Sequence, residues 1–323
     1  MSLFALAELE NAAELVHAVV PATPQYAWPL LARHTGAEVW VKHENHTPIG
    51  AFKVRGGITY LDWLRRSSAP GGVISATRGN HGQSIAFAAR RAGIPVSIVV
   101  PHGNSEEKNA AMESLGAELI VHGRDFDEAR AHAARVAQER SLHVVPSFHP
   151  LLVKGVASYA LELFRAVPSL DAVYAPIGLG SGICGVILVR DLLRLRTEII
   201  GVVAEEAPAL ARSIAAGKSV PTQAARTFAD GLACREPDPQ AMAIIAKGAA
   251  RLVCVREDEI AAAMRAYYAA THNVAEGAGA AALAGLVREG GRMRGRRVAL
   301  ILSGGNVDGA VLRQVLEGRT PAA

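Results

Sequence analysis

Residues 41–57 read VKHENHTPIGAFKVRGG, and the rest of the chain is best interpreted outward from this stretch. A short apolar strand is expected at Val39 to Val41, followed by a polar turn and a helix that opens at Phe52 and Lys53. Apolar neighbours on both sides would leave the Lys53 amine only partly hydrated. Desolvation disfavours the ammonium form and lowers the pKa of a lysine, which is how a lysine becomes a nucleophile. The competing interpretation is a helix-start lysine whose charge stays in water.

The composition is that of an ordinary globular protein. The chain has 323 residues, 50% of them hydrophobic and 20% charged, which is enough for one large domain or two of average size. With 34 Lys and Arg against 30 Asp and Glu, the net charge is +4, and no dense basic tract with interleaved aromatic residues is present. Nucleic acid is therefore not an expected partner.

Cysteine use and the N-terminus indicate the compartment. Cys184, Cys234 and Cys254 are odd in number and far apart, which argues against a disulfide framework and for a reducing environment. Residues 1–20 contain three glutamates and no basic segment, so they predict a helix rather than a signal peptide. No apolar run approaches about 18 residues, the length of a membrane span. We expect a cytoplasmic protein with no membrane association.

Strand-like apolar runs alternate with helical patterns, which is typical of an α/β fold with parallel sheets. Strands are expected at 72–76, 96–100, 118–121, 142–145, 172–175, 199–204, 252–255 and 298–302. The first four form a compact unit before His149 and Pro150. We therefore expect a small domain at 72–148 and a large domain formed by 1–71 and 149–323. Residues 217–240 contain three prolines and predict a functional loop.

Residues 75–83, Ser-Ala-Thr-Arg-Gly-Asn-His-Gly-Gln, lie between a strand and a helix. Such a turn presents backbone N–H groups and the positive end of a helix dipole, which suit an anion such as a carboxylate. The simpler interpretation is that Asn80 caps the helix with its side chain. Capping accounts for Asn80 alone and leaves the rest of this polar run unexplained.

Residues 175–185 read APIGLGSGICG and form a glycine-rich loop after a strand. Glycines allow the backbone to approach a phosphate closely while successive amides point at it. Gly180, Gly182 and Gly185 also match the G-x-G-x-x-G dinucleotide pattern, and Glu205 follows the next strand about 20 residues on. On this loop alone, NAD remains a competing ligand.

Two further loops adjoin apolar elements. Ser303-Gly304-Gly305-Asn306 ends the last strand, where a hydroxyl reaches a ligand ring or forms a plain turn. Glu276 opens an alanine-rich helix, where it complements the dipole or lies near a cofactor. No H-E-x-x-H, clustered Cys/His or G-x-S-x-G pattern is present, so metalloprotease and serine-hydrolase assignments lack support.

In this order, the four stretches resemble those of the fold-type II pyridoxal-phosphate enzymes, most closely the serine/threonine dehydratases and serine racemases. The resemblance covers residues 23–316 and is strongest at 50–56, 79–83 and 302–308. It implies a fold like that of the tryptophan synthase β subunit, with two open α/β domains of mainly parallel sheets. The cofactor, pyridoxal 5'-phosphate, would lie in the cleft between them, bound mainly by the large domain.

The resemblance also implies roles for individual residues. Lys53 would hold the cofactor as a Schiff base, Phe52 would lie beside its ring, and Ser303 would meet the pyridine nitrogen. Asn80 would bind the ring hydroxyl, with Glu276 also near the cofactor. The phosphate loop would comprise Gly178, Leu179, Gly180, Ser181 and Gly182. The substrate would contact Thr77, Arg78, Gly79, Asn80 and His81, with Asp230 and Gly231 beside its side chain. NAD would explain only the glycine loop.

The chain departs from the family pattern at several positions. Arg78 replaces the serine that acts as the second acid/base in serine racemases. A guanidinium does not readily accept a proton, so racemisation is not expected as the main activity. Val203 and Ala209 replace the acids of the racemase-type metal site, so no metal is expected. The phosphate loop reads Gly-Leu-Gly-Ser-Gly instead of four consecutive glycines. The chain stops at residue 323, and we expect no appended regulatory domain.

We expect elimination of water from L-threonine or L-serine and deamination to a 2-oxo acid and ammonia, with Lys53 as the base for the α-proton. An unusual β-hydroxy amino acid (3-hydroxyaspartate, phenylserine or a hydroxyectoine-derived compound) is an alternative substrate. Amino-acid racemase, β-substituting synthase, NAD-binding Rossmann protein and amino-acid sensor remain alternative functions. A homodimer is expected. Arg78 either binds a second carboxylate or, as we favour, rigidifies its turn by contacting an acid such as Glu276.

Overall fold

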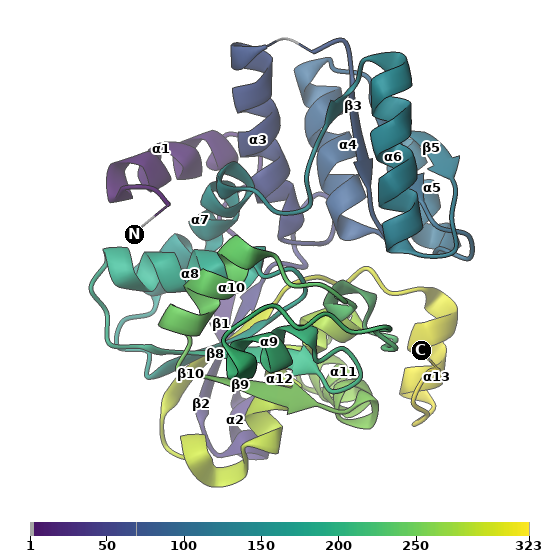
Figure 1. Cartoon of the computed structure of the whole chain (residues 1–323). Helices are drawn as coiled ribbons and strands as arrows, with labels where there is room; N and C mark the ends of the chain where they lie inside the picture. The colour runs from purple at the N-terminus through teal and green to yellow at the C-terminus, as the bar shows by residue number, and fades with distance from the viewer. Residues whose placement is uncertain (1–2, 69, 323) are drawn as a thin grey trace.

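The computed structural model describes residues 3–68 and 70–322, which form two largely parallel sheets (Figure 1). The larger sheet has six strands in the order β1-β2-β10-β7-β8-β9. Its strands are β1 (Gln25–Ala27), β2 (Glu38–His43), β7 (Ala172–Pro176), β8 (Glu198–Ala204), β9 (Arg251–Val255) and β10 (Arg297–Leu302). Edge strand β1 is antiparallel to β2, and the other neighbours pair in parallel.

The larger sheet is buried on both faces, as parallel sheets usually are. Side chains alternate between the faces along β8, so Ile200 and Val202 join one core while Ile199 and Val203 join the other. The first core is completed by α11 (Glu257–Thr271) and α12 (Gly277–Arg288). The second is completed by α7 (Pro150–Ala166), α8 (Ser181–Leu192) and α10 (Pro239–Gly248).

The smaller sheet has four parallel strands in the order β5-β4-β3-β6. They are β3 (Val73–Ala76), β4 (Val96–Val100), β5 (Glu118–Val121) and β6 (His143–Val144), all inside the range predicted for the small domain. One face packs on α6 (Phe126–Arg140). The other packs on α4 (Asn80–Ala92), which also contacts α3 (Lys53–Ser67). Figure 1 shows this unit above the larger sheet.

The remaining elements are peripheral to the two sheets. They are α1 (Leu6–His17), α2 (Pro29–Thr35), α5 (Glu106–Ser114), α9 (Ala209–Ala216), α13 (Gly309–Leu316) and the 3-10 turns η1 (Asp230–Leu232) and η2 (Gly290–Met293). The turn η1 belongs to the long loop predicted at 217–240, which ends where Pro239 starts α10. In the described part of the chain, no helix is long and apolar enough to cross a membrane.

The α/β prediction is confirmed, and every predicted strand is present to within two residues at each end. The N-terminal helix is confirmed as α1. The punctuation at His149 is also explained, because its side chain accepts from Leu151 N and caps α7, with Pro150 in the first turn. Strand β1 and helix α2 were not predicted. The strand is three residues long and mostly exposed, so it carries no alternating apolar pattern.

Candidate active site

A cavity of about 690 Å³ lies where the carboxyl ends of β3, β7 and β10 meet the loops that follow them. This is the place where open α/β sheets hold ligands. The predicted cofactor and substrate residues all line it, namely Phe52, Lys53, Thr77, Arg78, Gly79, Asn80, His81, Gly178, Leu179, Gly180, Ser181, Gly182, Asp230, Gly231, Glu276 and Ser303. The structure therefore brings these positions together, while the role of each stays a prediction.

Lys53 is the first residue of α3, and its amine is held near the start of α8. Its Nζ donates to Ser181 Oγ at 3.0 Å and lies 5.1 Å from the centre of the Phe52 ring. Burial lowers the pKa of Lys53 to about 8. A larger share of neutral amine is then present near neutral pH, which a lysine needs to act as a nucleophile or base. The interpretation of Lys53 as an ordinary solvated lysine is therefore wrong.

The backbone of Lys53 is tied to two other parts of the cavity wall. Phe52 N donates to Ser303 O at 3.0 Å, which joins the start of α3 to the end of β10. Ser84 Oγ, in α4, donates to Lys53 O at 2.6 Å. These bonds fix where the lysine side chain begins, relative to both sheets.

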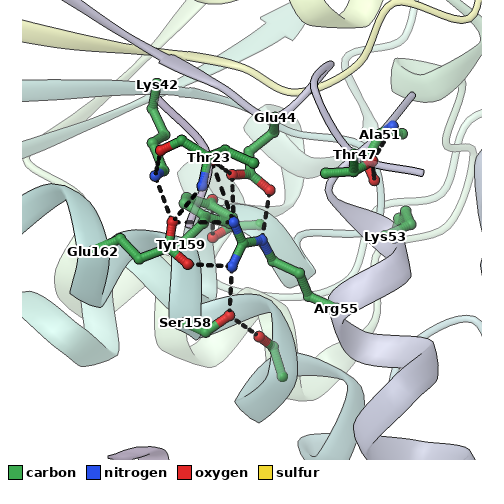
Figure 2. Close-up of polar contacts among 12 residues, drawn as sticks. Thr23, Lys42, Glu44, Thr47, Ala51, Lys53, Arg55, Ser158, Tyr159 and Glu162 are labelled. Atoms are coloured by element: carbon green, nitrogen blue, oxygen red, sulfur yellow. Dashed lines mark hydrogen bonds and ion pairs between the residues drawn. The ribbon is translucent and has the colours of Figure 1, made fainter. Parts of the chain in front are cut away.

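A buried ion cluster holds the first turn of α3 (Figure 2). Arg55 donates from Nε to Glu44 Oε2 at 2.7 Å and from Nη1 to Glu162 Oε1 at 2.5 Å. Lys42 Nζ donates to Glu162 Oε2 at 2.5 Å, and Ser158 Oγ accepts from Arg55 Nη1 at 2.9 Å. Two cations and two carboxylates balance, which is how buried charges are tolerated. The cluster joins the end of β2, the first turn of α3 and α7. Its Arg55 lies two residues after Lys53, the lysine in the cavity.

The glycine loop between β7 and α8 is closely packed. A Cβ at Gly178 would overlap the carbonyl oxygen of Gly231, so this loop and the turn η1 touch through their backbones. Gly180 is the N-cap of α8 and has φ +102°, a conformation that favours glycine. Tyr159 OH donates to Gly182 O at 2.9 Å and supports the loop. The first amides of α8 have no intrahelical acceptor, which makes this helix start suitable for an anion.

Two residues of the dinucleotide pattern, Gly185 and Glu205, do not take the positions that NAD binding requires. Gly185 packs against α7, where an added Cβ would lie 3.1 Å from Ala157 Cα. Glu205 is exposed and lies outside the cavity lining. The third glycine therefore serves helix packing, and the acid expected to bind a ribose is not in the cavity wall.

Asn80 connects two loops across the cavity instead of capping its helix. The N-cap of α4 is Gly79, and Asn80, the first helical residue, directs its side chain to Glu276 and Asn306, so the capping interpretation of Asn80 is wrong. Asn80 Nδ2 donates to Glu276 Oε1 at 2.7 Å, and Asn80 Oδ1 accepts from Asn306 Nδ2 at 2.8 Å. An amide nitrogen carries two N–H groups, so one remains for a ligand. Asn306 lies in a predicted loop, but the sequence did not indicate this role.

Glu276 is the N-cap of α12 and is buried in the cavity wall. Burial raises the pKa of Glu276 to about 7, although the cation of Lys108 opposes this shift. Its Oε2 has no hydrogen-bond partner among the residues that the structure describes. Glu276 thus combines the two interpretations of the sequence, a helix N-terminal position and a position in the cavity wall.

Thr77 and His81 shape the loop between β3 and α4. Thr77 Oγ1 accepts from Gly79 N at 3.0 Å and from Gly82 N at 3.3 Å, which closes the turn. His81 is buried, and its burial together with the nearby charge of Lys53 lowers its pKa to about 3. The imidazole is therefore neutral, and its Nε2 lacks a partner within residues 3–68 and 70–322.

Arg78 makes no hydrogen bond or ion pair with Glu276 or with any other described acid, so the structural role favoured for Arg78 is wrong. Asn80 binds Oε1 of Glu276, whose Oε2 stays without a described partner, and Asp230 forms an ion pair with Lys108. Lys108 was not predicted as a site residue. It lies in α5 after β4, next to β3 in the sheet, but the sequence does not show that it reaches across to η1.

A family model for pyridoxal-phosphate dependent enzymes matches residues 17–304. The biosynthetic L-threonine dehydratase of Pasteurella multocida is 31% identical over 306 residues, which are 94% of this chain and 60% of that protein. The mitochondrial threonine dehydratase of Schizosaccharomyces pombe is 33% identical over 309 residues, 94% of this chain and 52% of that protein. The chain thus spans between half and two thirds of the length of these relatives.

Solved structures are similar over almost the whole chain. The processed form of threonine deaminase isoform 2 from Solanum lycopersicum has a TM-score of 0.89 and 29% identity, covering 98% of this chain and 94% of that one. The maize serine racemase has a TM-score of 0.90 and 25% identity, covering 97% of each chain. The neighbours therefore share this fold while their names describe two different reactions.

Proposed function

The chain belongs to the family of pyridoxal-phosphate-dependent enzymes, and from this premise we propose that it converts a β-hydroxy amino acid such as L-threonine or L-serine into a 2-oxo acid and ammonia, by elimination of one water that is taken up again on hydrolysis. The observation that carries the proposal is the Lys53 amine, whose pKa burial lowers to about 8, at the start of α8. The threonine dehydratases among the relatives support the choice of substrate. We also propose that the cavity lies between a small domain, 72–148, and a large domain, 1–71 with 149–323.

The residues of the cavity wall fit the parts of pyridoxal phosphate. Lys53 supplies an amine for its aldehyde, and the glycine loop with the Ser181 hydroxyl suits its phosphate. Asn80 keeps one N–H for the ring hydroxyl. The Ser303 hydroxyl, which makes no hydrogen bond with any described residue, suits the ring nitrogen. The unpartnered Glu276 Oε2 also indicates a wall built for a polar ligand.

The chain's own groups divide the work of the reaction. When bound, the cofactor withdraws electrons from the substrate and so makes its α-proton acidic. Lys53 would remove that proton, which requires the neutral amine that burial favours. The amides at the start of α4 orient the substrate carboxylate. Ser303 would be a neutral partner for the ring nitrogen, which would favour prompt loss of the β-hydroxyl.

Racemisation fits the site less well. It needs a second acid/base on the face of the substrate opposite Lys53, and Arg78 takes the position of the serine that does this in serine racemases. A guanidinium stays protonated and does not accept a proton. We therefore rank the lyase above the racemase.

Absorbance spectra and product analysis test the proposal. The purified protein with pyridoxal phosphate should show a visible band that is lost in Lys53→Ala and kept in Lys247→Ala, a lysine outside the cavity lining. Adding L-threonine or L-serine should release a 2-oxo acid and ammonia. A visible band that persists in Lys53→Ala would disprove the assignment of Lys53. Absence of 2-oxo acid, with replacement of a β-leaving group by a thiol or amine, would indicate a β-substituting synthase.

A further inference from the structure

The cationic side chains that line the cavity differ in whether they have partners. They are Lys53, Arg78, Lys108, Arg130 and Arg235. Lys53 bonds to Ser181, and Lys108 pairs with Asp230. Arg130 and Arg235 both pair with Asp127. Arg78 makes no hydrogen bond or ion pair with any residue in 3–68 or 70–322. One permanently charged group in the wall therefore has no partner within the described chain.

The surroundings of Arg78 explain why it has no partner. Its backbone is fixed, because the Thr77 hydroxyl closes the turn by accepting from Gly79 N at 3.0 Å. The stem of Lys108 lies directly beneath, where a Cβ on Gly79 would be 2.6 Å from Lys108 Cδ. Lys108 forms an ion pair with Asp230, so that carboxylate is already bound to a cation. The guanidinium is left exposed on a fixed turn, at the boundary with a second cavity of about 420 Å³ that it also lines.

The proposed function requires two anions, the cofactor phosphate and the substrate α-carboxylate, and each has a suitable binding site without Arg78. The amides at the start of α8 suit the cofactor phosphate, and those at the start of α4 suit the substrate α-carboxylate. Arg78 is thus available for a third anion. Its five N–H donors form a planar fork that matches a carboxylate in two parallel hydrogen bonds. On this wall, the third anion would belong to the side chain of the substrate.

We propose that Arg78 is a specificity-determining residue that selects β-hydroxy amino acids with an anionic side chain, of which 3-hydroxyaspartate is a compact example. This inference rests on the proposed function and specifies its substrate class. The reaction needs no oxidant, because the water lost by elimination is taken up again on hydrolysis. The sum is one hydroxydicarboxylic amino acid giving one 2-oxodicarboxylic acid and one ammonia.

Steady-state kinetics of the holoenzyme test the selection. Wild type, Arg78→Gln and Arg91→Gln are compared on both diastereomers of L-3-hydroxyaspartate and on L-serine. The control removes the same charge from the exposed far end of α4. Wild type should prefer a hydroxyaspartate in kcat/KM. Arg78→Gln should lose at least about tenfold on it, as expected for a hydrogen bond between charged groups, and a clearly smaller factor on L-serine, while the control keeps both activities.

Equal losses on both substrates would overturn the proposal, because Arg78 would then bind the α-carboxylate. Turnover of L-serine without turnover of either hydroxyaspartate would also overturn it, while leaving the proposed function in place.

A binding measurement separates this inference from the proposed function. Calorimetry with the holoenzyme compares succinate, a dicarboxylate without an amine, with butyrate, a monocarboxylate of equal carbon number. Succinate should bind more tightly than butyrate to wild type, and Arg78→Gln should abolish the difference. An unchanged difference would overturn the anion site. If no substrate yields a 2-oxo acid, the proposed function fails, and the succinate result alone decides whether Arg78 binds a second anion.

Discussion

Arg55→Met removes one cation from the buried cluster and leaves its two carboxylates with Lys42 and with the His17 ring, whose Nε2 lies 2.7 Å from Glu162 Oε1. Arg55 and Glu44 are both 0% exposed, so Glu44 loses its ion-pair partner without gaining access to water. Removing one partner of a buried pair costs about 3–5 kcal/mol of unfolding free energy. Because Thr23 Oγ1 still donates to Glu44 at 2.5 Å, we expect the lower part of that range, about 3–4 kcal/mol.

Urea unfolding measures this loss against a matched surface variant, Arg140→Met. Arg140 pairs with Glu118 at 2.8 Å, but both side chains are about half exposed, so the control should lose less than about 1 kcal/mol. Glu44→Gln added to Arg55→Met should restore part of the stability, since it neutralises the unpaired carboxylate. If Arg55→Met loses no more unfolding free energy than the control, charge balance in the cluster does not stabilise the fold.

The same cluster predicts a change on the acid side. Burial alone would raise the pKa of Glu162, but Arg55 and Lys42 lower it to about 2. A carboxyl with a lowered folded-state pKa contributes stability above its ordinary pKa of 4.5, and this is lost as the pH falls toward about 2. Acid unfolding of Arg55→Met should therefore begin at a higher pH than that of wild type.

Three further outcomes follow from the cavity wall. Burial lowers the pKa of Lys53 to about 8, so the rate of cofactor attachment to the apoprotein should rise with pH up to about 8 and then level off. Stopped-flow absorbance measures this rate, and a rate independent of pH would contradict the prediction. Gly178→Ala should weaken cofactor affinity at least about tenfold in fluorescence titration, because the added methyl group overlaps Gly231 O. The control Gly71→Ala should leave the affinity unchanged, because its added methyl group has no atom within 4 Å. Glu276 has a raised pKa of about 7, so wild-type stability should fall as the pH rises from 4.5 to about 7, and Glu276→Gln should abolish that slope in urea titrations.

Local patterns in the sequence predicted most of the fold and the position of the cavity. Strands β4 and β8 are apolar runs bounded by turns, and the glycine loop has Gly180 at a positive φ that few other residues adopt. Such features depend on residues close together in the chain. Lys53 is different, because its apolar neighbours alone favour a solvated lysine and only the three distant loops, taken together, indicate a cofactor anchor.

Pairings between distant segments could not be predicted in this way. Lys108 and Asp230 are separated by 122 residues, and no pattern marks that lysine among the others on helices. The expected pairing of Arg78 with Glu276 is absent among the described residues, where Asn80 binds Oε1 of that carboxylate at 2.7 Å and Oε2 stays without a partner. Which donor reaches a given acceptor depends on tertiary geometry.

The charge-balanced cluster also bears on how the chain can be recombined with its relatives. Three members of the cluster, Lys42, Glu44 and Arg55, lie within the first 55 residues. The fourth, Glu162, comes from α7, which follows the strands of the small sheet in the sequence. A chimera with its crossover between residues 55 and 162 inherits the halves of the cluster from different parents. It stays balanced only if both parents use the same four charges. Exchange of the segment 72–148 alone leaves the cluster whole and is the safer graft.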